Sequence, residues 1–574
     1  MEARNRSLAD WFVKVRTGQV KLPRFQRHEA WGHNEIASLL ETVLRGLPAG
    51  ATLVLGVGNE EPFHSRYLKT APQGTERVTE HLLDGQQRMT ALWRALHDNY
   101  ESRTYLLRPG GDPEEDADER GPQVLSQARW MRDGARYPMW CDDARQVWER
   151  GYLPVRLLNP EGDSEVRSWA DAAAQDDLSI SRDIESLLMR LRSQVANYNV
   201  PYLSLPVTTR KDVALEVFIK MNTSSIRLSA FDIVVAQLEE ATGQSLHELV
   251  GDLRAAVPEA EHYRDLGNLV LDVAALRSDR PPTQASYQRL DLRRLPGEWG
   301  HLVAGIRWAV DLLQDERVYD GDRLPTIAVL PVLAALHEYV PSALDRAGNA
   351  RSLATAYLWR AFLTRRYEQS AATRSIQDLR GLRAAMIHDL PISEVEAPIF
   401  DTELTPLPDQ RDLTTARWPK TRDILARGVL AASLRAGGHD IADDKPARAE
   451  SLTKREYHHL FPDSLLTQIG GLPEGQSYRA LNCALITWST NRNISNKAPM
   501  QYLEERVSGA HLGAEAVANR LATHLIPYAE LMQAGPYEKG DGERLCADYE
   551  VFLDARARLM LPFMYDLCQG RPTR

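Results

Sequence analysis

The sequence KREYHHLFP at residues 454–462 places two adjacent histidines, His458 and His459, in a short apolar run that ends at Pro462. Asn482 follows about two dozen residues later, and Asn491 follows nine residues after that. This spacing suits a hairpin that holds one metal ion and hydrolyses a phosphodiester. Such a site needs a general base, a residue that orients the base, and two ligands for the metal ion. The stretch therefore predicts a site that cuts nucleic acid.

The same residues resemble the HNH, or ββα-metal, nuclease motif. The resemblance implies that His459 deprotonates water, that Asn482 holds its imidazole in the right tautomer, and that His458 and Asn491 ligate a divalent cation, Mg²⁺ or Mn²⁺. The first ligand of such motifs is often Asp or Glu, whereas this chain has His458. Neutral imidazole ligates transition metals more readily than magnesium, so Mn²⁺ or Ni²⁺ is expected to substitute well.

Two cations follow the last ligand along the chain. Arg492 and Lys497 flank the segment Asn493-Ile494-Ser495-Asn496. Guanidinium and ammonium groups bind phosphate oxygens, so these two side chains are expected to clamp DNA phosphates beside the cut bond. Asn493 is a second candidate ligand, and Asn493 or Asn496 could instead cap the next helix.

Length and composition predict a soluble protein of several domains. A chain of 574 residues is too long for one core, and its 43% apolar and 26% charged residues are ordinary for globular proteins. No long apolar run or secretory leader is apparent, so a cytoplasmic protein without membrane contact is expected. The four cysteines form no Cys-x-x-Cys pair, which argues against a zinc site or a disulfide scaffold.

Charge is distributed unevenly. The whole chain carries a formal net charge of −10, which is unusual for a protein that DNA attracts through a global field. Between residues 411 and 500, 13 Lys and Arg face 9 Asp and Glu, a local net of 13 − 9 = +4. Any surface for nucleic acid is therefore expected to be local and to lie in the C-terminal part.

The hydrophobic pattern predicts an α+β, multidomain chain. Residues 1–245 alternate strand-like runs, such as 52–57, 81–83 and 200–205, with helical periods, such as 35–45 and 86–99. Residues 246–410 are overwhelmingly helical, with clear periods at 266–276, 302–313 and 327–336, and end in a proline-rich linker candidate at 396–409. Residues 411–574 are expected to be mostly helical and to carry the histidine site. The acidic, Gly- and Pro-rich residues 109–122 predict an exposed loop.

A second candidate site lies in the N-terminal part. Asp84-Gly85-Gln86-Gln87-Arg88 follows a strand-like run and opens a helix. Free N–H groups and the dipole at a helix start attract phosphate, and the Arg88 guanidinium could donate two parallel hydrogen bonds to the same phosphate oxygens. Further polar groups come from Gln26 and Arg27 and from Asn222. The alternative is a tight Asp-Gly turn, with Arg88 paired to a carboxylate and Gln26 in a hydrogen-bonded corner.

These N-terminal clusters, in this order, resemble the DGQQR family of nucleotide-dependent defence proteins, whose fold is similar to ParB and sulfiredoxin domains. The whole chain is similar to the GmrSD, BrxU and SspE group, in which this domain is joined to a C-terminal HNH-type nuclease. The match there is His459-Leu460-Phe461-Pro462, Asn482, Asn491 and residues 494–497. The resemblance covers residues 5–110, 200–235 and 411–510.

The resemblance implies an NTP-dependent restriction endonuclease or nickase in anti-phage defence. It would bind double-stranded DNA that carries a mark, either a phosphorothioate linkage or glucosylated hydroxymethylcytosine, and use GTP or ATP. The sequence leaves open the mark, the nucleotide and whether the protein forms a homo-oligomer. It also leaves open two other functions: a regulatory nucleotide switch with a weak or vestigial nuclease, and a toxin-like effector that cleaves RNA.

Overall fold

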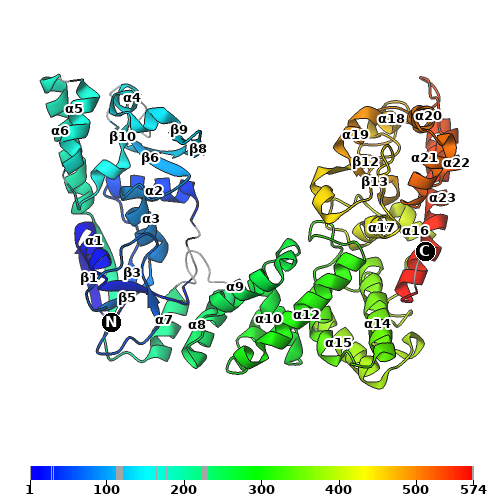
Figure 1. The fold of residues 1–574 in the computed structure, drawn as a ribbon, viewed down its shortest axis with the longest axis horizontal. Coiled ribbons are helices and arrows are strands. Elements are labelled where there is room, and N and C mark those ends of the chain that lie inside the picture. The colour runs from blue at the N-terminus through cyan, green and yellow to red at the C-terminus, as the bar shows by residue number, and fades with distance from the viewer. Residues whose placement is uncertain are drawn as a thin grey trace. The chain divides into compact units, whose positions relative to one another are not determined.

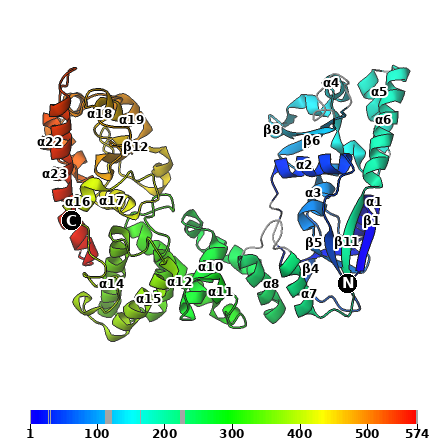
Figure 2. The same ribbon diagram turned by 180° about the vertical axis from the view of Figure 1, so that it is seen from behind.

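A computed structural model describes residues 2–26, 29, 31–110, 121–162, 164–175, 177–221 and 230–571. The chain divides into two compact units, residues 1–247 and 248–574 (Figures 1 and 2). The first unit ends close to the expected boundary at residue 245. The second unit contains both the helical residues from 248 to 410 and the residues that carry the histidine pair. Their division into two separate domains stays a prediction.

The N-terminal unit is built on a six-stranded mixed sheet. Its strands, in spatial order, are β1 (Glu2–Ser7), β11 (Asn199–Leu205), β3 (Thr52–Gly56), β5 (Glu80–Asp84), β2 (Val20–Pro23) and β4 (Ser65–Arg66). β3 runs parallel to β11 and antiparallel to β5, and β2 runs parallel to β5. The strands predicted at 52–57, 81–83 and 200–205 are confirmed as β3, β5 and β11.

Short strands and helices complete this unit. β6 (Arg103–Arg108) pairs with β10 (Leu153–Pro154) and β7 (Gln123–Ala128), and β8 (Trp130–Arg132) pairs with β9 (Ala135–Tyr137). The helices are α1 (Leu8–Thr17), α2 (His33–Leu44), α3 (Gln86–Leu96), α4 (Ala144–Glu149), α5 (Ser164–Ala174), α6 (Leu178–Ala196), α7 (Lys211–Met221) and α8 (Ala230–Thr242). Trp11 and Trp93 are core residues of this unit. Most of the loop predicted at 109–122 lies outside the described residues.

The C-terminal unit is mostly helical. Its helices are α9 (Leu246–Ala256), α10 (Leu266–Arg277), α11 (Gln284–Tyr287), α12 (Leu295–Asp315), α13 (Val329–Leu336), α14 (Leu344–Leu363), α15 (Ala371–His388), α16 (Gln410–Thr415), α17 (Ile424–Arg435), α18 (Asp463–Gln468), α19 (Trp488–Ile494), α20 (Pro499–Gly509), α21 (Gly513–Ala522), α22 (Tyr528–Gln533) and α23 (Gly542–Cys568). α14 packs against both α17 and α23. Gly428 permits the first contact, because a Cβ there would lie 2.3 Å from the carbonyl oxygen of Phe362.

The proline-rich segment at residues 396–409 is fixed within this unit. Ile399 is fully buried, its N–H donates to Asp378 at 3.1 Å, and its carbonyl accepts from Arg360. Tyr565 on α23 donates to the carbonyl of Pro408 at 3.0 Å. These contacts tie the segment to helices of its own unit, which is not the behaviour expected of a free linker.

One two-stranded sheet lies among these helices. β12 (Arg455–His459) pairs antiparallel with β13 (Cys483–Thr487), and α19 follows β13 directly. The chain is thus mixed α+β with more than one unit, as predicted. The order strand, strand, helix is that of the expected ββα arrangement. In the described part of the chain, no helix is long and apolar enough to cross a membrane.

Candidate functional site

The end of β12 presents the two histidines on opposite faces of the strand. In the antiparallel register, His458 lies opposite Ala484 and His459 lies opposite Cys483. Side chains alternate along a strand, so only every second residue of β12 shares a face with His458. His458 is buried and His459 is half-buried. The pair therefore occupies two environments that differ in access to solvent.

His458 contacts Asn491 on α19. Its Nδ1 lies 2.7 Å from Asn491 Oδ1, and the Asn491 amide donates to Glu456 Oε2 at 2.6 Å. Because the Asn491 oxygen can only accept, the Nδ1–H of His458 is the donor. Burial lowers the pKa of His458 to about 4, although the hydrogen bond that His458 donates to Asn491 opposes this shift. The imidazole is thus neutral at physiological pH, and its Nε2 is buried with no hydrogen-bond partner among the described residues.

His459 is held between two aromatic rings. Trp418 stacks on the imidazole with ring centroids 4.1 Å apart and an angle of 11° between the planes. Tyr478 meets the same ring edge-on at 4.7 Å. Burial lowers the pKa of His459, and the nearby Asp463 opposes that shift only in part. A neutral imidazole of fixed plane is the form that a general base requires.

Asn482 does not meet His459 in the way that the sequence predicted. Its fully buried side chain accepts from the N–H of Phe461 at 2.8 Å and donates to the carbonyls of Phe461 and Ser477, each at 3.0 Å. Both amide hydrogens are used in these two bonds, so neither is left to orient the imidazole directly. The amide fixes the backbone that follows His459 instead.

A loop that the sequence did not single out supports α19. Asp440, fully buried, accepts from the N–H of Thr487 at 2.7 Å and from the hydroxyl of Thr490 at 2.7 Å. Thr487 is the N-cap of α19, and Thr490 precedes Asn491. Burial raises the pKa of Asp440, but the hydrogen bonds outweigh it and hold the pKa below its ordinary value. The carboxylate is therefore a charged anchor for the helix that carries Asn491.

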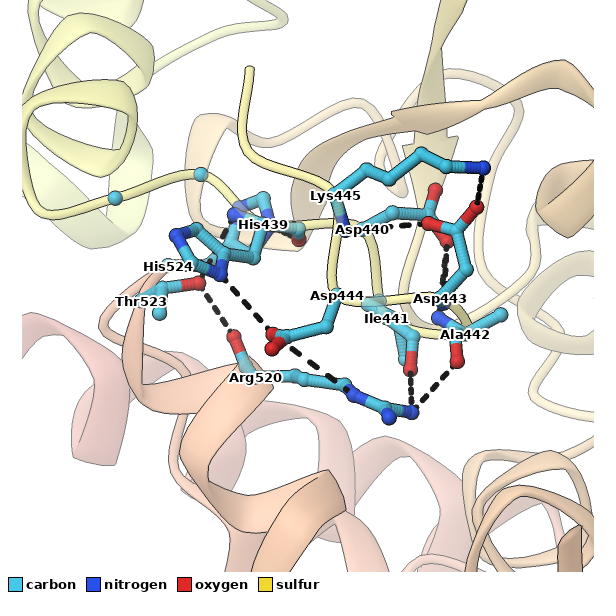
Figure 3. Close-up of polar contacts among 12 residues, drawn as sticks. His439, Asp440, Ile441, Ala442, Asp443, Asp444, Lys445, Arg520, Thr523 and His524 are labelled. Atoms are coloured by element: carbon cyan, nitrogen blue, oxygen red, sulfur yellow. Dashed lines mark hydrogen bonds and ion pairs between the residues drawn. The ribbon is translucent and has the colours of Figure 1, made fainter. Parts of the chain in front are cut away.

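Figure 3 shows how residues 439–445 are held from the other side. Arg520 on α21 donates to the carbonyls of Ile441 and Ala442, and His524 approaches the carbonyl of His439 at 2.6 Å. Arg455 at the start of β12 donates to the carbonyls of Gly438 and Lys445. The loop is tied to both the strand and the neighbouring helices, so Asp440 acts from a rigid base.

The two predicted phosphate clamps already have partners. The Arg492 guanidinium lies 4.0 Å above the ring of Trp488, and both side chains are exposed. Lys497 forms an ion pair with Glu505 at 2.7 Å and donates to the carbonyl of Asn493 at 3.3 Å. Lys497 would have to leave or share Glu505 to bind a phosphate, whereas the Arg492 guanidinium makes no hydrogen bond or ion pair with another described residue.

The donor set can be tested against a divalent cation. The described residues contain no group of three or more His, Cys, Asp and Glu side chains placed to hold a metal ion. His458 Nδ1 and Asn491 Oδ1 lie 2.7 Å apart, and both would face one cation if the ion replaced the proton between them and that proton moved to Nε2, which has no hydrogen-bond partner among the described residues. The Glu456 carboxylate accepts from the Asn491 amide behind them. This set fits an open site, in which water and substrate oxygens complete the coordination.

In the N-terminal unit, Asp84 ends β5 and Gly85 begins α3 in the left-handed region, with φ +93°. A Cβ at Gly85 would lie 2.4 Å from Thr52, so only glycine fits this turn. Gly85 as N-cap supplies no side-chain hydrogen bond to the helix, and the buried Gln86 and the adjacent Gln87 form its first turn. Trp31 donates its N–H to Gln87 at 3.4 Å.

Arg88 is committed to backbone. Its guanidinium donates to the carbonyls of Ala49 at 2.7 Å and Ala51 at 2.8 Å, and it lies 3.4 Å from Asp84. Gly50 permits this approach, because a Cβ there would lie 2.7 Å from Arg88 Nη1. This is the tight turn with a paired arginine that the sequence analysis left open as the alternative to a phosphate clamp.

Gln26 is a buried corner of this region. It donates to the carbonyls of Leu82 at 2.7 Å and Leu83 at 2.8 Å on β5, while its Oε1 has no hydrogen-bond partner among the described residues. Gln26 therefore lies against the strand that leads to Asp84. The other two predicted members, Arg27 and Asn222, lie outside the described residues.

Four residues of the C-terminal site were missed by the sequence analysis. Glu456 had a usable signal, because strand alternation places it on the face of His458 two residues away. Trp418, Tyr478 and Asp440 had none, since they reach the site only through tertiary packing.

Comparison with known proteins adds two findings. Residues 8–239 match the family model described as GmrSD restriction endonuclease, N-terminal domain. The chain is also 21% identical over 549 residues to the Uncharacterized protein MJ0686 of Methanocaldococcus jannaschii, an alignment that covers 88% of this chain and 87% of that protein. The first match falls within the N-terminal unit, and the second spans both units.

Proposed function

The match of residues 8–239 supports membership of the chain in the GmrSD-type, modification-dependent restriction family, and from this premise we propose a DNA endonuclease or nickase whose cutting site is built from His458, His459 and Asn491. One observation carries the proposal. The two residues chosen from sequence spacing as metal ligands, 33 positions apart, lie in contact, and His459 is adjacent on the same strand end. The chain is then a restriction-endonuclease-type defence protein.

His459 would remove a proton from the water that attacks the phosphodiester. Its lowered pKa keeps the ring unprotonated at neutral pH, so it can accept that proton. Stacking on Trp418 fixes the plane of the ring, which limits the loss of alignment between imidazole and water. Asn482 contributes indirectly, because its bonds to Phe461 fix the chain immediately after His459.

His458 and Asn491 would hold the cation, Mg²⁺ or Mn²⁺, with Glu456 orienting the Asn491 amide. When bound, the ion would stabilise the charge that develops on the phosphate and the leaving oxygen. The low pKa of His458 favours this role, because an imidazole that stays neutral does not repel the ion. Arg492 would contact a flanking phosphate, as would Lys497 after exchange with Glu505.

The N-terminal unit would bind GTP or ATP at the first turn of α3 and sense the DNA mark. Gly85 supplies no side-chain cap to α3, so phosphate oxygens would meet the positive end of the helix dipole at its first turn, Gln86 and Gln87. Arg88 would join them only by releasing the carbonyls of Ala49 and Ala51. Gln26 would place an unsatisfied amide oxygen near this strand end. The ParB- and sulfiredoxin-like fold belongs to this proposal.

The test is cleavage of supercoiled plasmid by the wild type and by His459→Ala. The substrates are unmodified, phosphorothioated and glucosyl-hydroxymethylated DNA, each with Mg²⁺ or Mn²⁺ and with or without GTP or ATP. The control is His388→Ala, an exposed histidine on α15 of the same unit. We expect cutting that is lost in His459→Ala, kept in His388→Ala and altered by one mark. Equal cutting by both variants would refute the assignment, and cleavage of RNA with duplex DNA untouched would refute the substrate.

A further inference from the structure

Two aromatic neighbours of His459, Trp418 and Tyr478, also line a groove. It has a volume of about 630 Å³ and is lined by two segments, residues 417–421 before α17 and 474–479 before β13. Trp418 and Tyr478 belong both to the lining of this groove and to the packing of His459. The groove and the imidazole therefore share two aromatic residues.

The two walls of the groove are tied together and to the catalytic segment. Arg479 donates to the carbonyl of Thr415 at 3.0 Å, and the N–H of Ala480 donates to the carbonyl of Ala416 at 3.0 Å. Asn482 joins the carbonyl of Ser477 in one wall to the backbone of Phe461 beyond His459. The groove is thus a built feature that keeps its position relative to His459.

Cations without partners line this groove. Arg417 and Lys420 are exposed, and neither forms an ion pair or a side-chain hydrogen bond with the residues that the structure describes. With Arg479 they give three positive charges against one carboxylate, Glu474, a local net of 3 − 1 = +2. Tyr478 leaves 41% of its surface exposed in the same place.

We propose that this groove binds the DNA strand next to the phosphate that is cut, with Arg417 and Lys420 on backbone phosphates and a base against the exposed face of Tyr478. The proposal rests on the nuclease function assigned above. Unpaired cations neutralise phosphates, and an exposed aromatic ring stacks on any base, so the two features together fit a polynucleotide. Tyr478 contacts His459, so a nucleotide stacked on Tyr478 places a neighbouring phosphate close to the His459 imidazole, the proposed general base.

The experiment measures binding separately from cutting. Fluorescence anisotropy of a labelled, unmodified DNA duplex is recorded over a salt titration with full-length His459→Ala, which does not cut. Adding Arg417→Gln and Lys420→Gln should reduce the slope of log K against log salt by about 1.8, since each phosphate contact contributes about 0.9. Tyr478→Ala should weaken binding by roughly tenfold through loss of stacking.

Two matched variants control for charge and for folding. Arg289→Gln with Arg293→Gln removes the same charge from two exposed side chains of the same unit that have no ion pair among the described residues, and should leave the slope unchanged. Arg417→Lys with Lys420→Arg keeps the charge in the groove and should restore the wild-type slope. An unchanged slope in the Arg417 and Lys420 double variant would refute DNA binding by the groove, even if plasmid cutting depends on His459.

The two proposals fail in different ways. A reduced slope in that double variant, combined with no cutting of any DNA by the wild type, would support the groove as a nucleic-acid surface and refute the nuclease. Normal cutting with a normal KM by a chain that carries Arg417→Gln and Lys420→Gln but keeps His459 would refute the groove and leave the nuclease in place.

Discussion

The sharpest prediction concerns Asp440, which touches no proposed ligand or base. Its carboxylate accepts from Thr487 and Thr490, each at 2.7 Å, and from the N–H of Ala442 at 2.9 Å. In Asp440→Asn the Oδ1 acceptor bonds to Thr490 and Ala442 can persist, but the new amide would face the Thr487 N–H with a donor. The start of α19 would then lose its anchor.

The magnitude follows from those bonds. Hydrogen bonds to a charged acceptor are worth about 1.5–3 kcal/mol and neutral ones about 1 kcal/mol, so two weakened bonds cost about 2 kcal/mol. An unpaired buried N–H at Thr487 adds about 1–3 kcal/mol. We therefore expect Asp440→Asn to lower the free energy of unfolding of the C-terminal unit by about 3–5 kcal/mol. Because Asn491 follows Thr490, metal affinity should fall by roughly 10- to 100-fold.

The assay is plasmid nicking as a function of Mn²⁺ concentration, combined with urea unfolding. The matched control is Asp443→Asn in the same loop, where the carboxylate's partners among the residues that the structure describes are the exposed Lys445 side chain and its backbone N–H. We expect a large rise in half-maximal Mn²⁺ for Asp440→Asn and none for Asp443→Asn. A variant that loses stability but keeps the wild-type half-maximal Mn²⁺ would show that Asp440 supports the fold without positioning Asn491.

Three further predictions concern His524, Arg88 and Arg556. Burial lowers the pKa of His524 to about 4, so only the unfolded chain takes up a proton at this histidine as pH falls below the ordinary 6.5. The free energy of unfolding should therefore fall by about 2 kcal/mol between about pH 7.5 and about pH 5. Urea unfolding should show a smaller pH dependence in His524→Gln than in the wild type, and an equal dependence would contradict this reasoning. Arg88→Ala should reduce nucleotide hydrolysis, measured with and without marked DNA, and turnover equal to the wild type would remove the phosphate role. Arg556 is fully buried and donates to three backbone carbonyls and one hydroxyl. Arg556→Met should therefore cost about 3 kcal/mol by urea unfolding, and a loss below about 1 kcal/mol would contradict this.

Much of the helical and strand pattern was predictable because it depends on local periodicity. The helices expected at 266–276, 302–313 and 327–336 are confirmed as α10, α12 and α13, and the strand and helix around Asp84 are confirmed as β5 and α3. α12 begins earlier than expected, at Leu295, because Pro296 near its first turn supports a helix start that the apolar pattern does not mark.

The site was predictable only where one strand and one helix present its members. The meeting of His458 and Asn491 follows from motif spacing, and it is present. The partners of Asn482 and Arg88 could not be read from the sequence, because each amide or guanidinium binds backbone carbonyls whose positions depend on loop conformation. A sequence motif identifies which side-chain group is available, but it does not predict which backbone oxygen that group will bind.

The same limit applies to charge. Motif matching singled out Lys497 as a phosphate clamp, yet Lys497 is paired with Glu505 at 2.7 Å. Arg417 and Lys420 belong to no motif, yet they are unpaired among the described residues and line a groove together with Trp418, which stacks on His459. An ion-paired cation must lose its partner before it can attract DNA, whereas an unpaired cation loses only water and counterions. Pairing in the fold, rather than the formal charge of −10, therefore decides where this acidic chain can hold a polyanion.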